Sequence, residues 1–305
     1  MNIVGHKKIW FAISILFVGA ALVAIGMFRF QQSPEFTGGT LWEFTVPAQS
    51  LSIADVQHEF VDGLKITNAQ VEYDPTNSSF LVTFGTLNEV GHQADLSMLK
   101  TQWPSFEELS FQSISPSIGA TLLQKSIMAI ILVLIGISLY IAFAFRKASR
   151  PISSWKYGWV TLLTLFHDVS IPAGLLAILG YLKGVQINSD FIVALLVVMG
   201  FSVHDTIVVF DRIRENVLNY RGKKPFAEIV NDSVNQTMAR SINTSVTLIL
   251  VLLALYFMGP ADLQYFVLTL LVGVATGIYS SIFIASPLLV VISPKEANAG
   301  SARLS

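Results

Sequence analysis

Residues 198–216, VMGFSVHDTIVVFDRIREN, decide how the rest of the chain folds. The first two-thirds of this stretch have the composition of a membrane-spanning helix, yet His204 and Asp205 lie inside it. An ionisable side chain in a bilayer costs several kcal/mol unless it is paired or solvated, so an intramembrane aspartate indicates a functional site. After Phe210 the sequence becomes abruptly charged, which is typical of a helix that leaves the membrane into the cytoplasm.

The composition of the whole chain indicates a membrane protein. Of its 305 residues, 53% are hydrophobic and 13% are charged, whereas soluble domains carry about 25% charged residues. The net charge of −1 argues against nucleic-acid binding, which requires a basic surface. The absence of cysteine excludes disulfides and thiol chemistry.

Six apolar runs are long enough to cross a bilayer as helices, which takes about 20 residues. They are 9–28, 126–145, 157–182, 191–210, 241–259 and 265–292. The first run is longer than the apolar core of a cleaved signal peptide, about 7–15 residues, so we predict an uncleaved anchor. The last run is expected to be tilted or broken near Pro287. A small residue at every fourth position of this run predicts a helix-packing face: Gly273, Gly277, Ser281 and Ala285.

Positive charges in the short connecting loops predict the orientation. Lysine and arginine are concentrated in 146–156 and 212–224, whereas 183–190 holds only Lys183 and 259–264 holds none. The positive-inside rule therefore places both termini in the cytoplasm and residues 31–125 outside.

Residues 31–125 are polar and have the pattern of a small globular domain. We predict strands at 40–46, 69–73, 80–84 and 110–114, and helices at 52–64 and 94–103. Ser52 is expected to cap the first helix, and Asp74–Asn77 to form a hairpin turn. The order βαββαβ predicts a ferredoxin-like α+β fold. The predicted organisation is a terminus and first span at 1–30, this domain at 31–125, five spans at 126–292 and a cytoplasmic tail at 293–305.

Two His–Asp pairs and one arginine lie in or beside the predicted spans: His167, Asp168, His204, Asp205 and Arg240. A metal site is not expected, because adjacent helical residues lie about 100° apart and ligands three or four positions apart suit one ion better. An aspartyl protease would need two carboxylates sharing a proton, and the Gly-x-Gly-Asp signature of intramembrane members is absent.

A proton relay fits these residue types better. Burial favours a protonated carboxyl group and a nearby arginine favours the carboxylate, so a movable Arg240 could switch Asp205 between the two states. The alternative is a permanent Asp205–Arg240 ion pair that only joins two helices. Residue types alone leave both open.

Three motifs make the chain resemble a known family. GFSVHDTIVVFDRIREN at 200–216, RSINTSVT at 240–247 and FTGGT at 36–40 resemble SecF, the membrane-subunit family of the bacterial protein-export apparatus. The resemblance covers nearly the whole chain. SecD-type chains carry a much larger domain after the first span, so the short 31–125 segment favours SecF.

The resemblance implies the resistance-nodulation-division superfamily, in which two six-helix halves form one proton-driven machine. SecD would be the second half, and the SecYEG channel, a YajC-like subunit and the translocating preprotein further partners. The protein would assist late translocation and release of preproteins at the bacterial inner membrane, with 31–125 periplasmic. No cofactor, metal or enzymatic step is expected. The alternative is half of a proton-driven exporter of small molecules or lipids, and a passive scaffold for the channel comes third.

The resemblance also implies which residues act. The family's fourth-span aspartate and fifth-span arginine are tied to proton passage and match Asp205 and Arg240. Asp168 and His204 are further candidates, and His204 stands where the family commonly has Asn, which adds a group that can titrate near neutral pH. The remaining motif residues are Phe36, Gly38, Gly39, Asp211 and Arg212. The glycines are expected to form a turn that leads into a strand.

Overall fold

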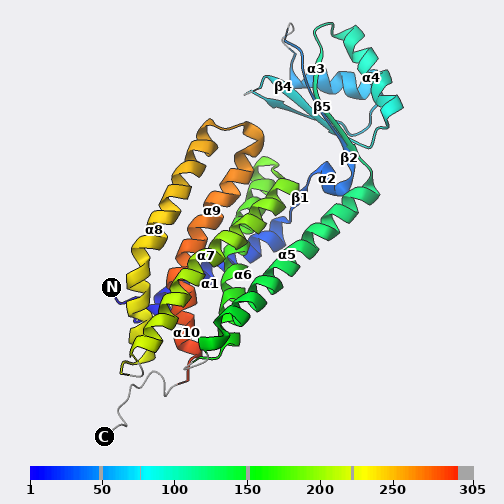
Figure 1. Ribbon diagram of the computed structural model, residues 1–305. Helices are drawn as coiled ribbons and strands as arrows, with labels where there is room; N and C mark the ends of the chain where they lie inside the picture. The colour runs from blue at the N-terminus through cyan, green and yellow to red at the C-terminus, as the bar shows by residue number, and fades with distance from the viewer. Residues whose placement is uncertain (48–50, 76, 149–151, 221–222, 295–305) are drawn as a thin grey trace. The chain divides into compact units, whose positions relative to one another are not determined.

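The computed structural model describes residues 1–47, 51–75, 77–148, 152–220 and 223–294. The chain forms two compact units, one of Met1–Gln31 and Met128–Ser305, the other of Gln32–Ile127. The first is a bundle of long helices and the second contains a four-stranded sheet (Figure 1). Thr76 of the predicted turn, Arg150 and Arg221 of the basic loops, and 295–305 of the predicted tail lie outside the described residues.

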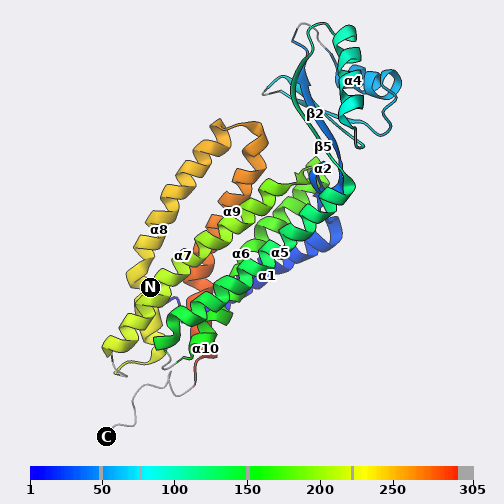
Figure 2. The same cartoon turned by 45° about the vertical axis from the view of Figure 1, so that its right-hand side comes forward.

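Six helices among the described residues are long and apolar enough to cross a membrane, which confirms the predicted number of spans. They are α1 (Lys7–Phe28), α5 (Pro116–Ala144), α6 (Ser154–Lys183), α7 (Ser189–Tyr220), α8 (Phe226–Met258) and the run Gln264–Ile292. This last run comprises α9 (Gln264–Ser280), the π-helical segment η4 (Ser281–Ala285) and α10 (Ser286–Ile292). The beginning of α1 and the end of α10 lie at the same end of the bundle (Figures 1 and 2).

Two helices begin well before the apolar runs that predicted them. α5 begins at Pro116 rather than at 126, because proline suits the first turn of a helix. α8 begins at Phe226 rather than at 241, and its added part buries Phe226, Ile229 and Val230 along one face. Hydropathy detects the lipid-facing part of a helix and not its amphipathic extension. Arg240 therefore lies inside α8 rather than at its start.

The predicted break near Pro287 is present. The π-helical segment η4 ends two residues before Pro287, which lies in the first turn of α10. Proline has no N–H to donate to the carbonyl four residues earlier, and its ring crowds that carbonyl. The widened turn is completed in part by Ser286 Oγ, which donates to the Ser281 carbonyl at 3.2 Å. The irregularity adjoins Ser280 and Ser281, which take part in the site below.

The inner layer of the bundle consists of α6, α7 and the Gln264–Ile292 run. In the apolar 18-residue stretch of each of these helices, 56% of the residues are buried inside the protein. The corresponding share is 17% for α1, α5 and α8. The predicted packing face is confirmed where α9 meets α7: a Cβ on Gly273 would overlap a Val198 methyl, and one on Gly277 would lie 3.1 Å from the Ser202 Cβ. Larger residues here would force these helices apart.

The second unit is an α+β domain. Its elements are the short helix α2 (Pro34–Thr37), β2 (Gly39–Thr45), α3 (Ile53–His58) with its π-helical continuation η1 (Glu59–Gly63), β3 (Gln70–Asp74), β4 (Ser79–Phe84), α4 (Glu89–Gln102) and β5 (Glu107–Ile114). The antiparallel sheet has the order β3-β4-β2-β5, which is the predicted ferredoxin-like arrangement. The Ser52 cap is also confirmed, since Ser52 Oγ accepts from the Asp55 N–H and the Asp55 carboxylate accepts from the Ser52 N–H.

Two elements of this domain begin earlier than predicted. α4 begins at Glu89 rather than at 94, because Asn88 caps it by accepting the Gly91 N–H at 2.8 Å. β5 begins at Glu107 rather than at 110, beyond a bulge where its pairing with β2 shifts between Glu43 and Phe44. A bulge adds one residue to one strand and disturbs the alternation on which the prediction depended.

The interior of the domain is aromatic. Its largest buried side chains are Trp42, Phe44, Phe60, Phe80, Phe84, Trp103 and Phe106. One polar cluster enters it: Glu108 Oε2 accepts from Trp42 Nε1 at 3.0 Å and lies 2.7 Å from His92 Nε2.

Candidate functional site

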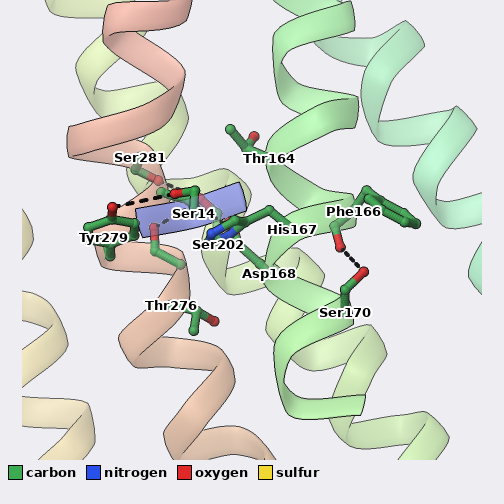
Figure 3. Close-up of polar contacts among 12 residues, drawn as sticks. Ser14, Thr164, Phe166, His167, Asp168, Ser170, Ser202, Thr276, Tyr279 and Ser281 are labelled. Carbon is green, nitrogen blue, oxygen red and sulfur yellow. Dashed lines mark hydrogen bonds and ion pairs between the residues drawn. The ribbon is translucent and has the colours of Figure 1, made fainter. Parts of the chain in front are cut away.

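A fully buried carboxylate on α6 joins the three helices of the inner layer. Asp168 Oδ2 accepts hydrogen bonds from Ser202 Oγ of α7 at 2.5 Å and from Ser280 Oγ of α9 at 2.7 Å. Asp168 Oδ1 lies 2.8 Å from Nδ1 of its neighbour His167 (Figure 3). Pro172 follows one turn later in α6 and has no N–H to donate to the Asp168 carbonyl, so one helical hydrogen bond is missing here.

His167 is buried against a tyrosine of α9 that in turn contacts α1. Its ring stacks on Tyr279, with centroids 6.1 Å apart, and the Tyr279 hydroxyl donates to the Trp10 carbonyl at 2.9 Å. Ser14 Oγ of α1 donates to the Tyr279 hydroxyl at 3.4 Å (Figure 3). When Asp168 is a carboxylate, the His167 Nδ1 that faces it carries the ring hydrogen. The other ring nitrogen, Nε2, is buried and has no hydrogen-bond partner among the described residues.

Asp205 lies one turn after Ser202 on α7 and faces a different helix. It is 2% exposed, and its Oδ2 accepts from Ser245 Oγ of α8 at 3.2 Å. His204 is exposed, so the two neighbours occupy different sides of α7. Within the described chain, the ion pairs do not include one between Asp205 and Arg240.

Arg240 lies beside a later part of α7. It lines a groove of about 300 Å³ with Ile207, Asp211 and Arg214, which follow Asp205 along α7. Asp211 Oδ1 lies 3.5 Å from Arg214 Nη2, and Arg212 Nη1 forms an ion pair with Glu215 Oε2 at 2.7 Å. The structure therefore places Asp211, rather than Asp205, in the same groove as Arg240.

The FTGGT motif forms a tight junction at one end of the α+β domain. Gly38 and Gly39 have φ values of +79° and +146°, which favour glycine, and Phe36 is buried. A Cβ on Gly38 would lie 2.5 Å from the Pro116 Cα, and one on Gly119 would lie 2.7 Å from the Phe36 carbonyl oxygen. The segments before β2 and after β5 therefore pass in direct contact.

The serines that bind the two aspartates were not singled out from the sequence. Ser202 and Ser245 lie inside the GFSVHD and RSINTSVT motifs, which was the signal available, while Ser280 carried none. The residues that the structure describes contain no cluster of three or more His, Asp or Glu side chains that could hold a metal ion.

Comparison with known proteins shows the family. The family model "Protein export membrane protein SecD/SecF, C-terminal" matches residues 95–295. The chain is 40% identical over 317 residues to the protein translocase subunit SecF of Thermobaculum terrenum, covering 97% of this chain and 95% of that one. The chain belongs to the SecF family of protein translocase subunits.

Some relatives contain a SecF part within a longer SecDF chain. The protein translocase subunit SecDF of Thermus thermophilus is 34% identical over 296 residues, which are 95% of this chain and 38% of that one. The crystal structure of a Thermus SecDF, described as a translocon-associated membrane protein, matches 95% of this chain with a TM-score of 0.78 and 32% identity. Because SecF is joined to SecD in these relatives, a SecD partner is implied for this SecF-family chain.

Proposed function

We propose that this chain acts with SecD in Sec protein translocation, using the proton-motive force to assist late translocation and release of preproteins across the bacterial inner membrane. The near full-length similarity to SecF carries the translocation role. One charge moving through about 100 mV gains about 2.3 kcal/mol, enough to bias a domain movement. Residues 31–125 would handle the emerging chain, and the SecYEG channel and a YajC-like subunit would be further partners. No catalytic step is proposed.

The geometry of Asp205 supports proton coupling. A carboxylate this buried, with one hydroxyl donor at 3.2 Å and no cation paired to it in the described chain, is costly as an anion. The structure therefore fits the protonated form of Asp205. When α8 slides so that Arg240 approaches Asp205, the ion pair favours the carboxylate and the proton leaves. His204, exposed next to Asp205, would assist proton exchange.

The decisive experiment is Asp205→Asn alone and together with Arg240→Gln, in membranes that contain SecD. Asp205→Asn keeps shape and hydrogen bonding but cannot release a proton, so the variant should bind SecD normally while proton-dependent export assistance is lost. Asp190→Asn is the matched control, because it removes an exposed carboxylate from the first turn of the same helix, and Asp190 does not line the groove that holds Arg240. If export recovered in the double variant, Asp205 would be one half of a structural ion pair and the relay would be rejected.

The proposed orientation has its own test. A reporter that is active only outside the cytoplasm should be active when fused near Ser78 and silent when fused at Lys223, because the positive-inside rule predicts that only the first lies outside.

Deletion of 31–125 should leave the six spans inserted and bound to SecD while late export fails. Normal export by the truncated chain would contradict the role of this domain in handling the preprotein.

A further inference from the structure

The charges around Asp168 do not balance unless the site holds a proton. The groups facing the carboxylate are His167 on its own helix, Ser202 from α7 and Ser280 from α9. Tyr279 of α9 and Ser14 of α1 lie behind His167, and Asp205 is one turn from Ser202. No lysine or arginine is among these contacts in the described part of the chain. An anionic Asp168 beside a neutral His167 would be an uncompensated buried charge, whereas one added proton makes the pair neutral.

His167 offers a place for that proton. Since Nδ1–H points at Asp168, the neutral ring leaves Nε2 as a bare, buried acceptor without a partner among the described residues. A proton that binds the Nε2 lone pair creates an imidazolium ion against the Asp168 carboxylate. The same proton can instead reside on Asp168, with His167 neutral.

Ser280 allows either form without an unsatisfied hydroxyl. Its Oγ lies 2.7 Å from Asp168 Oδ2 and 3.1 Å from the Gly277 carbonyl oxygen. Next to a carboxylate, the hydroxyl donates to Asp168. Next to a protonated Asp168, it can turn to donate to Gly277 while its oxygen accepts from the acid. A permanently ionised Asp168 that only joins helices needs just the bond from Ser280 to Asp168. A carboxyl group that changes its protonation state needs the alternative bond to Gly277 as well.

From this juxtaposition we propose that His167 and Asp168 form a second proton-binding site, which holds one proton in the closed bundle and releases it when the inner layer opens. The site rests on the proposed proton coupling and adds a group to it on α6. Ser202 would connect the two sites, because its hydrogen bond to Asp168 is stronger when Asp168 is charged and Ser202 precedes Asp205 by one turn on α7. The charge on Asp168 thereby biases the position of the helix that carries Asp205.

The site can be observed without an export assay. In the complex with SecD in liposomes, infrared difference spectra between acid and alkaline buffer report buried carboxyl groups, and ¹⁵N spectra of labelled histidine report the protonation of Nε2. The His167 signal is assigned by its loss in His167→Gln. We expect one protonation change at His167–Asp168, absent in Asp168→Asn and retained in Asp205→Asn. A His167 that stays neutral beside a permanently ionised Asp168 throughout the titration would overturn the proposal.

Two serine variants separate the hydroxyl switch from general packing. Ser280→Ala removes one donor to Asp168 and the alternative bond to Gly277, so the titration of the pair should shift. Ser170→Ala is the matched control, because Ser170 is also buried, on α6, but donates to the Phe166 carbonyl at 2.6 Å (Figure 3). Equal titrations in both variants would contradict the role of Ser280, and this readout is independent of whether Asp168→Asn folds.

Export assays then connect the site to function. Asp168→Asn should reduce proton-dependent export assistance while SecD binding is kept. Full assistance in this variant would overturn the coupling role even if Asp205→Asn behaves as proposed. If wild-type export showed no dependence on the proton gradient, the proposed function would fail, and the spectra would still decide whether the pair binds a proton.

Discussion

The α+β domain and the inner layer of the helix bundle are held together by different means. The domain packs large rings against one another, with Phe44 and Phe106 centroids 4.7 Å apart and Trp42 and Phe111 centroids 5.3 Å apart. The inner layer brings helices close with glycine and serine and joins them through one carboxylate at Asp168.

The difference follows from the solvent. In water, removing apolar surface is the dominant driving force, so a small domain gains most from large buried rings. In lipid there is no such force between helices, because the surrounding chains are as apolar as the side chains. Close van der Waals contact and interhelical hydrogen bonds must then supply the stability. A membrane bundle can therefore keep an ionisable group at its centre as part of its structure.

The largest effect is expected from Trp42→Ala. This variant removes a fully buried ring and the Nε1 donor to Glu108, which should destabilise the domain by about 3–5 kcal/mol. Hydrogen-exchange mass spectrometry of the full chain should show lost protection in 39–114 and unchanged protection in α6 and α7. Loss in both regions would mean that the domain and the bundle fold as one cooperative unit.

Asp168→Ala should be the most damaging polar truncation in the bundle. It leaves Ser202 Oγ and the His167 Nδ1–H without their acceptor, at about 1–3 kcal/mol for each buried group, while Ser280 can turn to Gly277. Asp205→Ala leaves only the Ser245 hydroxyl without its acceptor, so it should cost about 1–3 kcal/mol for that single group. Thermal unfolding of both variants in the same detergent measures the difference. Equal losses would show that the two aspartates are structurally equivalent.

A smaller effect is expected where α9 meets α7. A methyl added by Gly273→Ala meets Val198, so the bundle should lose about 1–3 kcal/mol from overpacking. Gly200→Ala is the control, because a Cβ there meets nothing within 4 Å and alanine favours a helix by about 0.5–1 kcal/mol. The thermal midpoint should therefore fall in the first variant and stay or rise in the second. An equal change in the thermal midpoint of both variants would contradict the idea that close packing of glycine stabilises the inner layer.

The smallest effect concerns pH and the first helix of the domain. Hydrogen bonds from Ser52 hold the pKa of the Asp55 carboxyl below its ordinary value of 3.8. Because the folded state favours the carboxylate, this contribution is present above pH 3.8 and is lost as the pH falls through the lowered value. Amide exchange in 53–58 should be faster in Ser52→Ala than in the wild type above that range. Below it the difference should become smaller, because only the bond from the Asp55 N–H to Ser52 Oγ is independent of the carboxylate, and a constant difference would assign the effect to the hydroxyl alone.

The sequence predicted the parts of the fold that depend on local pattern. Uncharged runs located the six spans, and alternating residues with a capping serine located most of the domain. It failed where the decisive interaction is not local: α8 begins at Phe226 because that segment packs on one face, and β5 begins at Glu107 because of a bulge that only the partner strand reveals. The first turn of α4 contains Gly91, a poor helix former, and depends on the Asn88 cap, so its residue types alone do not predict a helix.

The candidate site was predictable by residue type but not by geometry. A buried aspartate is conspicuous in an apolar run, so Asp168 and Asp205 could both be named. The partners could not, because Ser202 and Ser280 lie 34 and 112 residues from Asp168 and serine is common in membrane helices. The predicted approach of Arg240 to Asp205 assumed that Arg240 is the first residue of its helix. Because α8 begins at Phe226, Arg240 lies inside the helix instead.

The contact of Gly38 with Pro116 has a consequence for how such chains change in evolution. An inserted domain whose two ends touch can be enlarged or replaced without changing the distance between those ends. Loop-closure entropy grows only with the logarithm of the added length, so even a large insertion costs little. Families that share one membrane scaffold can therefore differ widely in the part they present to water.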